Sequence, residues 1–298
     1  MIGSLKYSSL GDEYFAQVET KNLENSKLIH VNQSLKKELN LDISDETLLS
    51  ICSGEKKLGD VAPISTVYAG HQFGNLTMLG DGRAILLGEH VDDSGQRRDI
   101  QLKGAGRTPF SRGGDGRAAL GPMLREYIIS EALHALNIPA TRSLAVTHTG
   151  DRVHRDTLLP GAILTRVATS HIRVGTFQYA AGQQDPALLE QLVDYTIARH
   201  YPSLEGVENK ALALFETILE TLPKDAATLT SRGHALKTLG KQDEAVSSYQ
   251  AASRTKCAHG DAWYALANLK TYTFSDDELA TLKAQEAGTD LGFMDRIY

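Results

Sequence analysis

The chain has 298 residues, of which 41% are hydrophobic and 23% are charged, with a formal net charge of −6 at pH 7. This length suits about two domains. The hydrophobic fraction supports a packed core and excludes a disordered chain. No apolar stretch approaches the ~18 residues of a membrane-spanning helix. The negative charge argues against nucleic acid as a bulk partner.

Two further features concern the cellular compartment. The N-terminal segment carries Asp12 and Glu13 and has no apolar core of a signal peptide. Cys52 and Cys257 lie far apart and form no C-x-x-C motif, which excludes a disulfide scaffold. We therefore expect a cytoplasmic protein that contacts no membrane.

Glycine is unevenly distributed. Of the 26 glycines, 12 fall between Gly70 and Gly121, and only 6 follow Leu204. The chain changes character near that point, so we predict two domains of different kinds, residues 1–204 and residues 205–298.

In chain order, the first elements expected are strands. Short apolar runs at 76–78, 83–91 and 99–102 are separated by Leu79-Gly80-Asp81-Gly82 and by Asp92-Asp93-Ser94-Gly95. Both separators are turn-forming, so the three runs predict an antiparallel meander. A further apolar run at 162–167 predicts another strand.

Two helices are expected around that last strand. The first starts near Pro122 and ends at Asn137-Ile138-Pro139, with Leu124, Tyr127, Ile128 and Leu136 at helical spacing. The second covers 187–200 and is amphipathic, with an apolar face of Leu188, Leu189, Leu192, Val193 and Ile197. Strands followed by a helix predict a sheet with a helix packed against it.

One five-residue string occurs twice. Gly80-Asp81-Gly82-Arg83-Ala84 returns as Gly114-Asp115-Gly116-Arg117-Ala118. Glycines let backbone amides approach an anion, and an arginine after the turn offers a planar fork to phosphate oxygens. The alternative is a pair of ordinary hairpin turns, each followed by a solvated arginine.

A lysine and a glutamate form a second candidate feature. Lys103 ends an apolar strand, and Glu126 lies 23 residues further on, inside the predicted helix. Kinase-like folds use such a strand lysine, paired with a helix glutamate, to direct an ammonium group at phosphates. The alternative is that Glu126 is a solvated helix charge.

These residues, with several longer strings, carry a family resemblance. Tyr68-Ala69-Gly70-His71-Gln72-Phe73-Gly74, the segment 101–112 and the segment 164–177 resemble the selenoprotein O / YdiU family. The resemblance covers about residues 15–204. It implies an α+β protein-kinase-like N-lobe, truncated here, that takes part in transferring AMP from ATP (or UMP from UTP) to protein hydroxyls.

The resemblance also implies site residues. Contacts to the nucleoside triphosphate would come from Gly80, Gly82, Arg83, Lys103, Asp115, Gly116, Arg166 and Arg173, with Glu126 as the partner of Lys103. The family uses Mg²⁺ or Mn²⁺, but its Asn-Thr-Asp-Asn and Asp-Tyr-Gly-Pro strings do not occur in this chain. We therefore assign no catalytic residue and no metal ligand, and expect impaired transfer.

The tail follows another pattern. Ala211, Phe215, Ile218 and Pro223 are followed 34 positions later by Ala245, Tyr249, Ala252 and Cys257, a spacing typical of tetratricopeptide repeats. Helices are expected at 209–222 and 261–270, with a full helical repeat at 226–258. The region 207–298 resembles the repeats of repeat-containing sulfotransferases, without a phosphosulfate-binding loop. Trp263 is expected in the repeat core rather than as a ligand platform.

Three functional hypotheses follow. The chain is an impaired protein adenylyltransferase, a nucleotide-binding pseudo-enzyme lobe joined to a scaffold that binds a protein partner, or a fusion fragment without a function of its own. The absent metal-binding strings argue against turnover, because phosphate charge would go uncompensated.

Overall fold

The structure is a computed structural model that describes residues 2–21, 23–58, 62–72, 75–92, 95–269 and 271–287. Phe73, Gly74, Asp93, Ser94 and Lys270, which belong to segments discussed above, lie outside the described residues. The chain divides into two compact units, Met1–Tyr195 and Thr196–Tyr298. This division falls inside helix α5 (Pro186–His200), whereas the composition changes near residue 204. The junction at 204/205 stays a prediction.

The first unit is built on one nine-stranded sheet. Its strands are β1 (Ile2–Ser4), β2 (Phe15–Gln17), β3 (Lys27–Val31), β4 (Ile64–Gln72), β5 (Asn75–Gly80), β6 (Ala84–Val91), β7 (Arg97–Lys103), β8 (Arg142–His154) and β9 (Leu158–Ala168). Its helices are η1 (Lys6–Leu10), α1 (Gln33–Glu38), α2 (Asp45–Cys52), α3 (Leu120–Ala135), α4 (Val174–Gly182) and most of α5.

The strand order is β2-β4-β6-β7-β9-β8-β3, with β1 added on β6 and β5 on β4. The predicted pairing of the second and third strands is confirmed, because β6 and β7 are antiparallel from Ala84 opposite Lys103 to Val91 opposite Arg97. The predicted strand at 162–167 is the central part of β9, which pairs with β7 and β8.

The full meander is wrong at its first strand. Within the described residues, β5 pairs with β4, with Val67 opposite Gly80, and not with β6. The physical reason is that β4, a strand that the pattern of apolar runs did not predict, pairs with both β5 and β6. Its first residue, Ile64, lies opposite Leu86 of β6, while its later part takes β5. Between them the amide of Asp81 donates to the carbonyl of Thr66 over 2.9 Å, so the Gly-Asp-Gly turn is held against β4.

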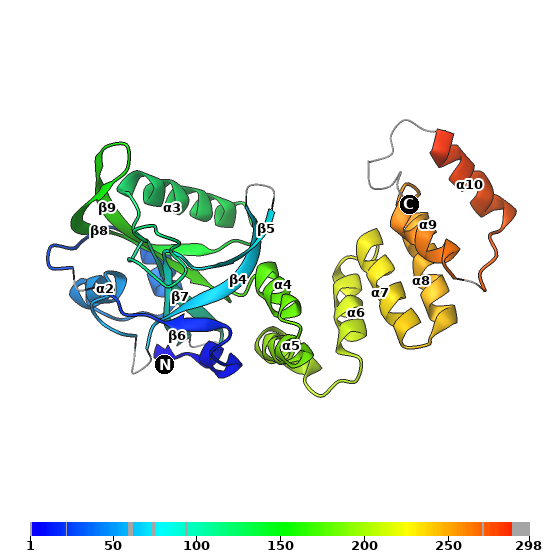
Figure 1. Cartoon of the computed structure of the whole chain (residues 1–298), viewed down its shortest axis with the longest axis horizontal. Coiled ribbons are helices and arrows are strands. Elements are labelled where there is room, and N and C mark those ends of the chain that lie inside the picture. Colours follow the sequence, from blue (N-terminus) through cyan, green and yellow to red (C-terminus); the bar gives the residue numbers. More distant parts are fainter. Residues whose placement is uncertain are drawn as a thin grey trace. The chain divides into compact units, whose positions relative to one another are not determined.

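Helix α3 covers one face of the sheet along β8 and β9 (Figure 1). Met123 is buried there with Val146 and Leu164, and this confirms the predicted sheet with a packed helix. Ile128 and Leu136, expected on the same apolar stripe, are 61% and 69% exposed. Successive helix residues point about 100° apart, so a helix that buries Met123 turns Ile128 outward. Leu136 falls on the helix end, beyond α3 itself.

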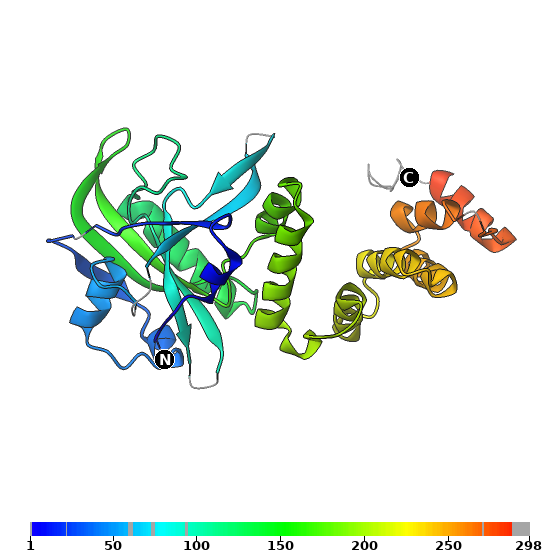
Figure 2. The ribbon, with the colours of Figure 1, turned by 60° about the horizontal axis from the view of Figure 1, so that its bottom comes forward.

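Two other clusters pack elsewhere in this unit. Leu35 and Leu48, from α1 and α2, pack with Leu144 and Val167 of the sheet. Near β4 and β6, α4 and α5 contribute buried Ala180 and Leu192 to a cluster that includes Tyr14 and Leu86. The predicted apolar face of α5 is confirmed, since Leu192 and Ile197 are both buried. Figure 2 shows α4 and α5 following one another beside the sheet.

The second unit is helical in its described part. After the end of α5 it contains η2 (Pro202–Leu204), α6 (Lys210–Thr221), α7 (Ala226–Thr238), α8 (Gln242–Thr255), α9 (Gly260–Ala267) and α10 (Asp276–Ala287). The expected helices at 209–222, 226–258 and 261–270 correspond to α6 through α9. None of the helices in the described ranges is long and apolar enough to cross a membrane.

Close packing of α7 on α8 organises this second unit. A Cβ atom added at Gly233 would run into the ring of Tyr249, which is itself fully buried. Trp263 is 8% exposed in the same cluster, and its Nε1 donates to the carbonyl of Cys257 over 2.8 Å. The core role predicted for Trp263 is confirmed, while the identity of the repeat family stays a prediction.

Candidate functional site

A carboxylate from α3 joins cations from two strands. One oxygen of Glu126 lies 2.5 Å from Nζ of Lys103, at the end of β7, and the other lies 3.3 Å from Nη1 of Arg166, on β9. The side chains of Lys103 and Arg166 are only 19% and 13% exposed. The predicted pairing of Lys103 with Glu126 is therefore present, and the alternative of a solvated Glu126 is wrong.

Burial governs the ionisation of this cluster. Burial lowers the pKa of Lys103, while the hydrogen bond that its ammonium group donates to Glu126 opposes that shift. Burial likewise lowers the pKa of Arg166, with the charge of Glu126 acting the other way. Charged groups withdrawn from water interact strongly with a charged ligand, because little solvent screens them. Lys103 and Arg166 thus form a partly desolvated cationic pair held by one carboxylate.

Arg173 joins this cluster through Asp81 and Gln101. The Nη2 atom of Arg173 lies 3.4 Å from one carboxylate oxygen of Asp81, and its guanidinium group stacks 4.6 Å from the ring centroid of Tyr68. The other oxygen of Asp81 accepts from Nε2 of Gln101 over 3.0 Å. The side-chain oxygen of Gln101 in turn accepts from Arg166. The structure therefore connects Arg166 and Arg173 through hydrogen bonds and an ion pair, a connection that their spacing in the sequence did not predict.

The first Gly-Asp-Gly turn lies between β5 and β6, beside this network. A Cβ atom at Gly80 would meet the ring of Phe110, and one at Gly82 would meet the carbonyl oxygen of Phe110 at 2.7 Å. These glycines thus admit the segment around Phe110. Arg83, which follows them, is exposed and precedes β6, next to the β-sheet pair of Ala84 and Lys103.

The second copy of the string has different surroundings. Asp115 is exposed, and its carboxylate lies 2.8 Å from Nη1 of Arg155, whose hydrogen bonds lower the pKa of Asp115. Gly116 has φ +66° and packs directly on the carbonyl of Gly106. In the described residues, Asp115 accepts hydrogen bonds from the side chain of Arg155 and from the amide of Arg117. The two identical strings therefore occupy unlike environments.

Asp81, Gln101 and Tyr68 belong to this network although the sequence pattern indicated no role for them. Asp81 stood inside the doubled string, so its position was visible, but nothing in the sequence distinguished its buried side chain from the exposed one of Asp115. Gln101 and Lys103 lie two residues apart on β7, and this spacing places both side chains on the same side of the strand. This spacing is the signal that could have identified Gln101.

A divalent cation would need several carboxylate or histidine ligands close together. The described residues contain no group of three or more His, Cys, Asp or Glu side chains that could hold a metal ion. The described part of the chain thus does not fit a complete metal site, and we derive no chemical step through one.

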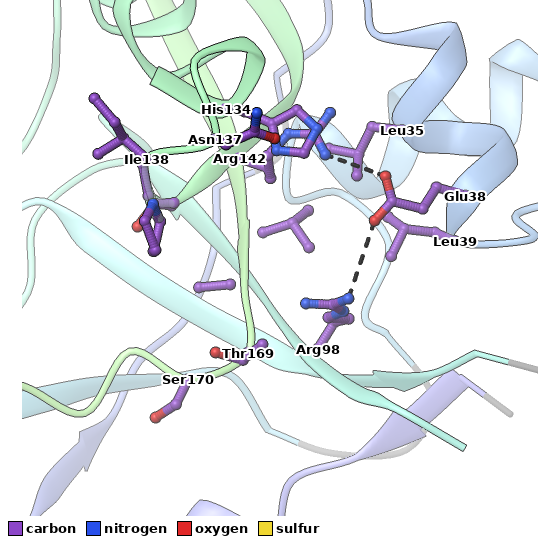
Figure 3. A pocket seen from close by; sticks show the side chains of 15 residues that line it. Leu35, Glu38, Leu39, Arg98, His134, Asn137, Ile138, Arg142, Thr169 and Ser170 are labelled. Atoms are coloured by element: carbon purple, nitrogen blue, oxygen red, sulfur yellow. Dashed lines mark hydrogen bonds and ion pairs between the residues drawn. The ribbon is translucent and has the colours of Figure 1, made fainter. Parts of the chain in front are cut away.

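A surface pocket of about 540 Å³ lies elsewhere in the first unit (Figure 3). Its walls come mainly from α1, the end of α3 and the end of β9, and none of the nine predicted site residues lines it. Figure 3 shows the carboxylate of Glu38 between Arg142, at 3.1 Å, and Arg98, at 4.0 Å. Arg98 and Arg142 thus share one carboxylate, as Lys103 and Arg166 share Glu126.

Comparison with known proteins identifies the family. The family model described as "Protein adenylyltransferase SelO" matches residues 4–241. A protein named "Protein nucleotidyltransferase YdiU" from Alcanivorax borkumensis is 68% identical over 217 residues, which is 72% of this chain and 44% of that protein. Proteins of the same name from Halalkalibacterium halodurans and Geobacillus kaustophilus are each 55% identical, over 72% of this chain and 44% and 45% of their own lengths.

The chain belongs to the SelO protein adenylyltransferase family. It spans less than half the length of these curated relatives. The match also extends past residue 204 to 241, which takes in α6 and α7 of the second unit.

Proposed function

We propose that the first unit binds a nucleoside triphosphate, ATP or UTP, as the nucleotide-binding part of a protein adenylyltransferase. The observation that carries this proposal is the bridge from Glu126 to both Lys103 and Arg166. Such a bridge keeps two cations in place before an anion arrives. Arginine forks and lysine ammonium groups are the side chains that proteins use for phosphate oxygens.

The reaction of the family would proceed at the α-phosphorus. A hydroxyl oxygen of the acceptor protein forms a bond to that phosphorus, the bond to the β-phosphate oxygen breaks, and pyrophosphate leaves. The hydroxyl proton passes to a base. In this chain, Lys103, Arg166 and Arg173 would hold the negatively charged phosphates and stabilise the charge that develops on the leaving group.

We propose in addition that the chain on its own transfers little or no AMP. Two facts support this: the family strings Asn-Thr-Asp-Asn and Asp-Tyr-Gly-Pro do not occur in the sequence, and the described residues gather no metal-ligand group. The proposed activity is therefore nucleotide binding without efficient turnover.

The test combines binding and transfer. We expect ATP to raise the melting temperature of the full chain and Lys103→Ala to abolish that rise. Lys36→Ala, which removes a lysine paired with exposed Asp45, serves as the matched control and should retain it. Labelled ATP with Mg²⁺ or Mn²⁺ should give little self-labelling. Strong labelling that depends on Lys103 would contradict impaired transfer, and an absent ATP response would contradict nucleotide binding.

A second candidate function concerns the helical unit. We propose that it is a tetratricopeptide-like scaffold that binds a protein partner, supported by the close approach of α7 to α8 at Gly233 and by a concave pocket of about 440 Å³ lined by α8, α9 and α10. Thr281→Arg would fill this pocket, whereas Ser247→Arg on the exposed side of α8 would not. Affinity capture by the full chain should lose the same partner only in the first variant.

A further inference from the structure

The side chain of Asp81 is buried at the centre of the site network, with 3% exposure. Its backbone carbonyl accepts from Oγ of Ser65 over 2.7 Å and from Oγ1 of Thr108 over 2.8 Å. Its carboxylate oxygen Oδ2 accepts from Oγ1 of Thr66 over 2.8 Å and from Nε2 of Gln101 over 3.0 Å. Asp81 is therefore fixed from several directions before any ligand is present.

The same carboxylate is connected to two arginines, directly to Arg173 and through Gln101 to Arg166. Oδ1 of Asp81 faces Nη2 of Arg173 at 3.4 Å, and Oδ2 holds Gln101, whose side-chain oxygen accepts from Arg166. Arginine side chains have many rotamers, and ordering them when a ligand binds costs free energy. A rigid anchor that orders both side chains beforehand removes part of this cost.

We propose that Asp81 is a positioning residue of the nucleotide site, which orients Arg173 directly and Arg166 through Gln101. The inference rests on the proposed function, because the two arginines need orienting only if they bind phosphates. Asp81 acts through the arginines. The Gly-Asp-Gly turn thus serves the site by directing its aspartate inward, while its flanking glycines make room for Phe110.

A second effect of Asp81 has the opposite sign. A carboxylate near a bound triphosphate repels it, so removing the charge would by itself strengthen binding. The two effects separate experimentally because orientation of Arg173 requires Arg173, whereas repulsion does not. A double-mutant cycle therefore distinguishes them.

The experiment measures ATP binding to the full chain by titration calorimetry for Asp81→Asn, Arg173→Ala and the double variant. We expect Asp81→Asn to weaken binding about tenfold, the effect of losing one charge-assisted hydrogen bond. In the Arg173→Ala background the same change should weaken binding by less than about threefold. Glu89→Gln alters an equally buried carboxylate, paired with Arg97 at 3.0 Å, and should leave ATP affinity unchanged.

Two outcomes of this cycle would overturn the proposal. Equal losses in both backgrounds would show that Asp81 does not act through Arg173, and tighter binding in both would show that repulsion dominates. If Asp81→Asn does not fold, as judged by its melting curve, Thr66→Val carries the test, since it removes one anchor of the carboxylate; unchanged ATP affinity in that variant would overturn the proposal. Failure of the unaltered chain to bind ATP would instead contradict the proposed function.

Discussion

The carboxylate of Glu126 contacts the ammonium group of Lys103 at 2.5 Å, across the gap between α3 and the end of β7. This contact opposes the effect of burial, which lowers the pKa of Lys103 below its usual 10.5. The protonation state of Lys103 therefore depends on the helix carboxylate as well as on burial.

Glu126→Gln should shift the pH dependence of nucleotide binding. Only protonated Lys103 attracts phosphates, so ATP affinity falls as pH rises through the pKa of Lys103. Replacing Glu126 removes the favourable interaction between its carboxylate and the ammonium group of Lys103, and this lowers the pKa of Lys103 further. The fall in ATP affinity therefore moves to lower pH. Calorimetric titrations between pH 7 and pH 10 measure the shift.

Lys103→Arg provides the control for this pH profile. An arginine stays protonated over the whole range, so the alkaline fall in ATP affinity due to residue 103 should disappear. A Glu126→Gln profile that coincides with that of the unaltered chain would contradict the proposed coupling.

Gly116→Ala should destabilise the first unit by about 3 kcal/mol or more. Gly116 has φ +66° and its added methyl group would run into the carbonyl of Gly106. Left-handed backbone costs a non-glycine residue about 1 kcal/mol, and the clash adds to it. Gly113 has φ +83°, but an added Cβ atom would lie in open space. Gly113→Ala should therefore lower the free energy of unfolding only by the conformational cost of about 1 kcal/mol. Urea unfolding of both variants measures the difference, and equal losses would contradict the close approach.

Glu131→Gln should destabilise the chain by about 1–3 kcal/mol at pH 7. Burial raises the pKa of Glu131, but hydrogen bonds from Arg142 and from the amide of Ser143 outweigh it and hold the pKa below 4.5. A carboxylate whose pKa is lowered by folding stabilises the fold above its unfolded pKa, and this stabilisation is lost as pH falls through the folded pKa.

The difference between Glu131→Gln and the unaltered chain should therefore shrink below about pH 4. Unfolding in denaturant at pH 7 and at pH 3 measures it. Asp151→Asn, which alters a half-exposed carboxylate beside Arg117, should cost less than about 1 kcal/mol at either pH. A difference for Glu131→Gln that is independent of pH would rule out the charge as its cause.

Gly233→Ala should loosen the second unit. The new methyl group would press on the buried ring of Tyr249, and overpacking of this kind costs about 1–3 kcal/mol. Hydrogen exchange of α7 and α8 in the full chain should accelerate, while exchange in β6 and β7 should not. Ser247→Ala on the exposed side of α8 should leave exchange unchanged or slow it. Unaltered exchange in Gly233→Ala would contradict tight packing at this position.

The sequence predicted elements whose patterns are local. The β6–β7 pairing and α5 follow from turn residues and apolar spacing, and the Lys103–Glu126 pair from a known way of binding phosphate. The partner of β5 was missed because strand order depends on β4, whose Tyr68-Ala69-Gly70-His71 string has no apolar alternation. The outward direction of Ile128 was missed because spacing cannot decide which of two neighbouring residues meets the sheet.

The site was only partly predictable for a related reason. Arg166 and Arg173 were identified by resemblance, but their linkage runs through Asp81, in the turn between β5 and β6, and through Gln101 of β7. Contacts of that range are set by strand register, which the sequence alone does not specify. The buried aspartate and the exposed one of the repeated string look identical until the sheet places them.

Identical pentapeptides thus have unequal tolerance to change in this chain. At position 81 the carboxylate is enclosed and its oxygens are occupied, so even glutamate would be too long. At position 115 the carboxylate faces solvent and pairs with Arg155, so a longer carboxylate would meet no enclosing wall. A single rule for the Gly-Asp-Gly-Arg-Ala string would therefore misjudge the effect of substitutions in one of its two copies. The surroundings of each aspartate come from the rest of the fold, so the string placed in another loop would not reproduce them.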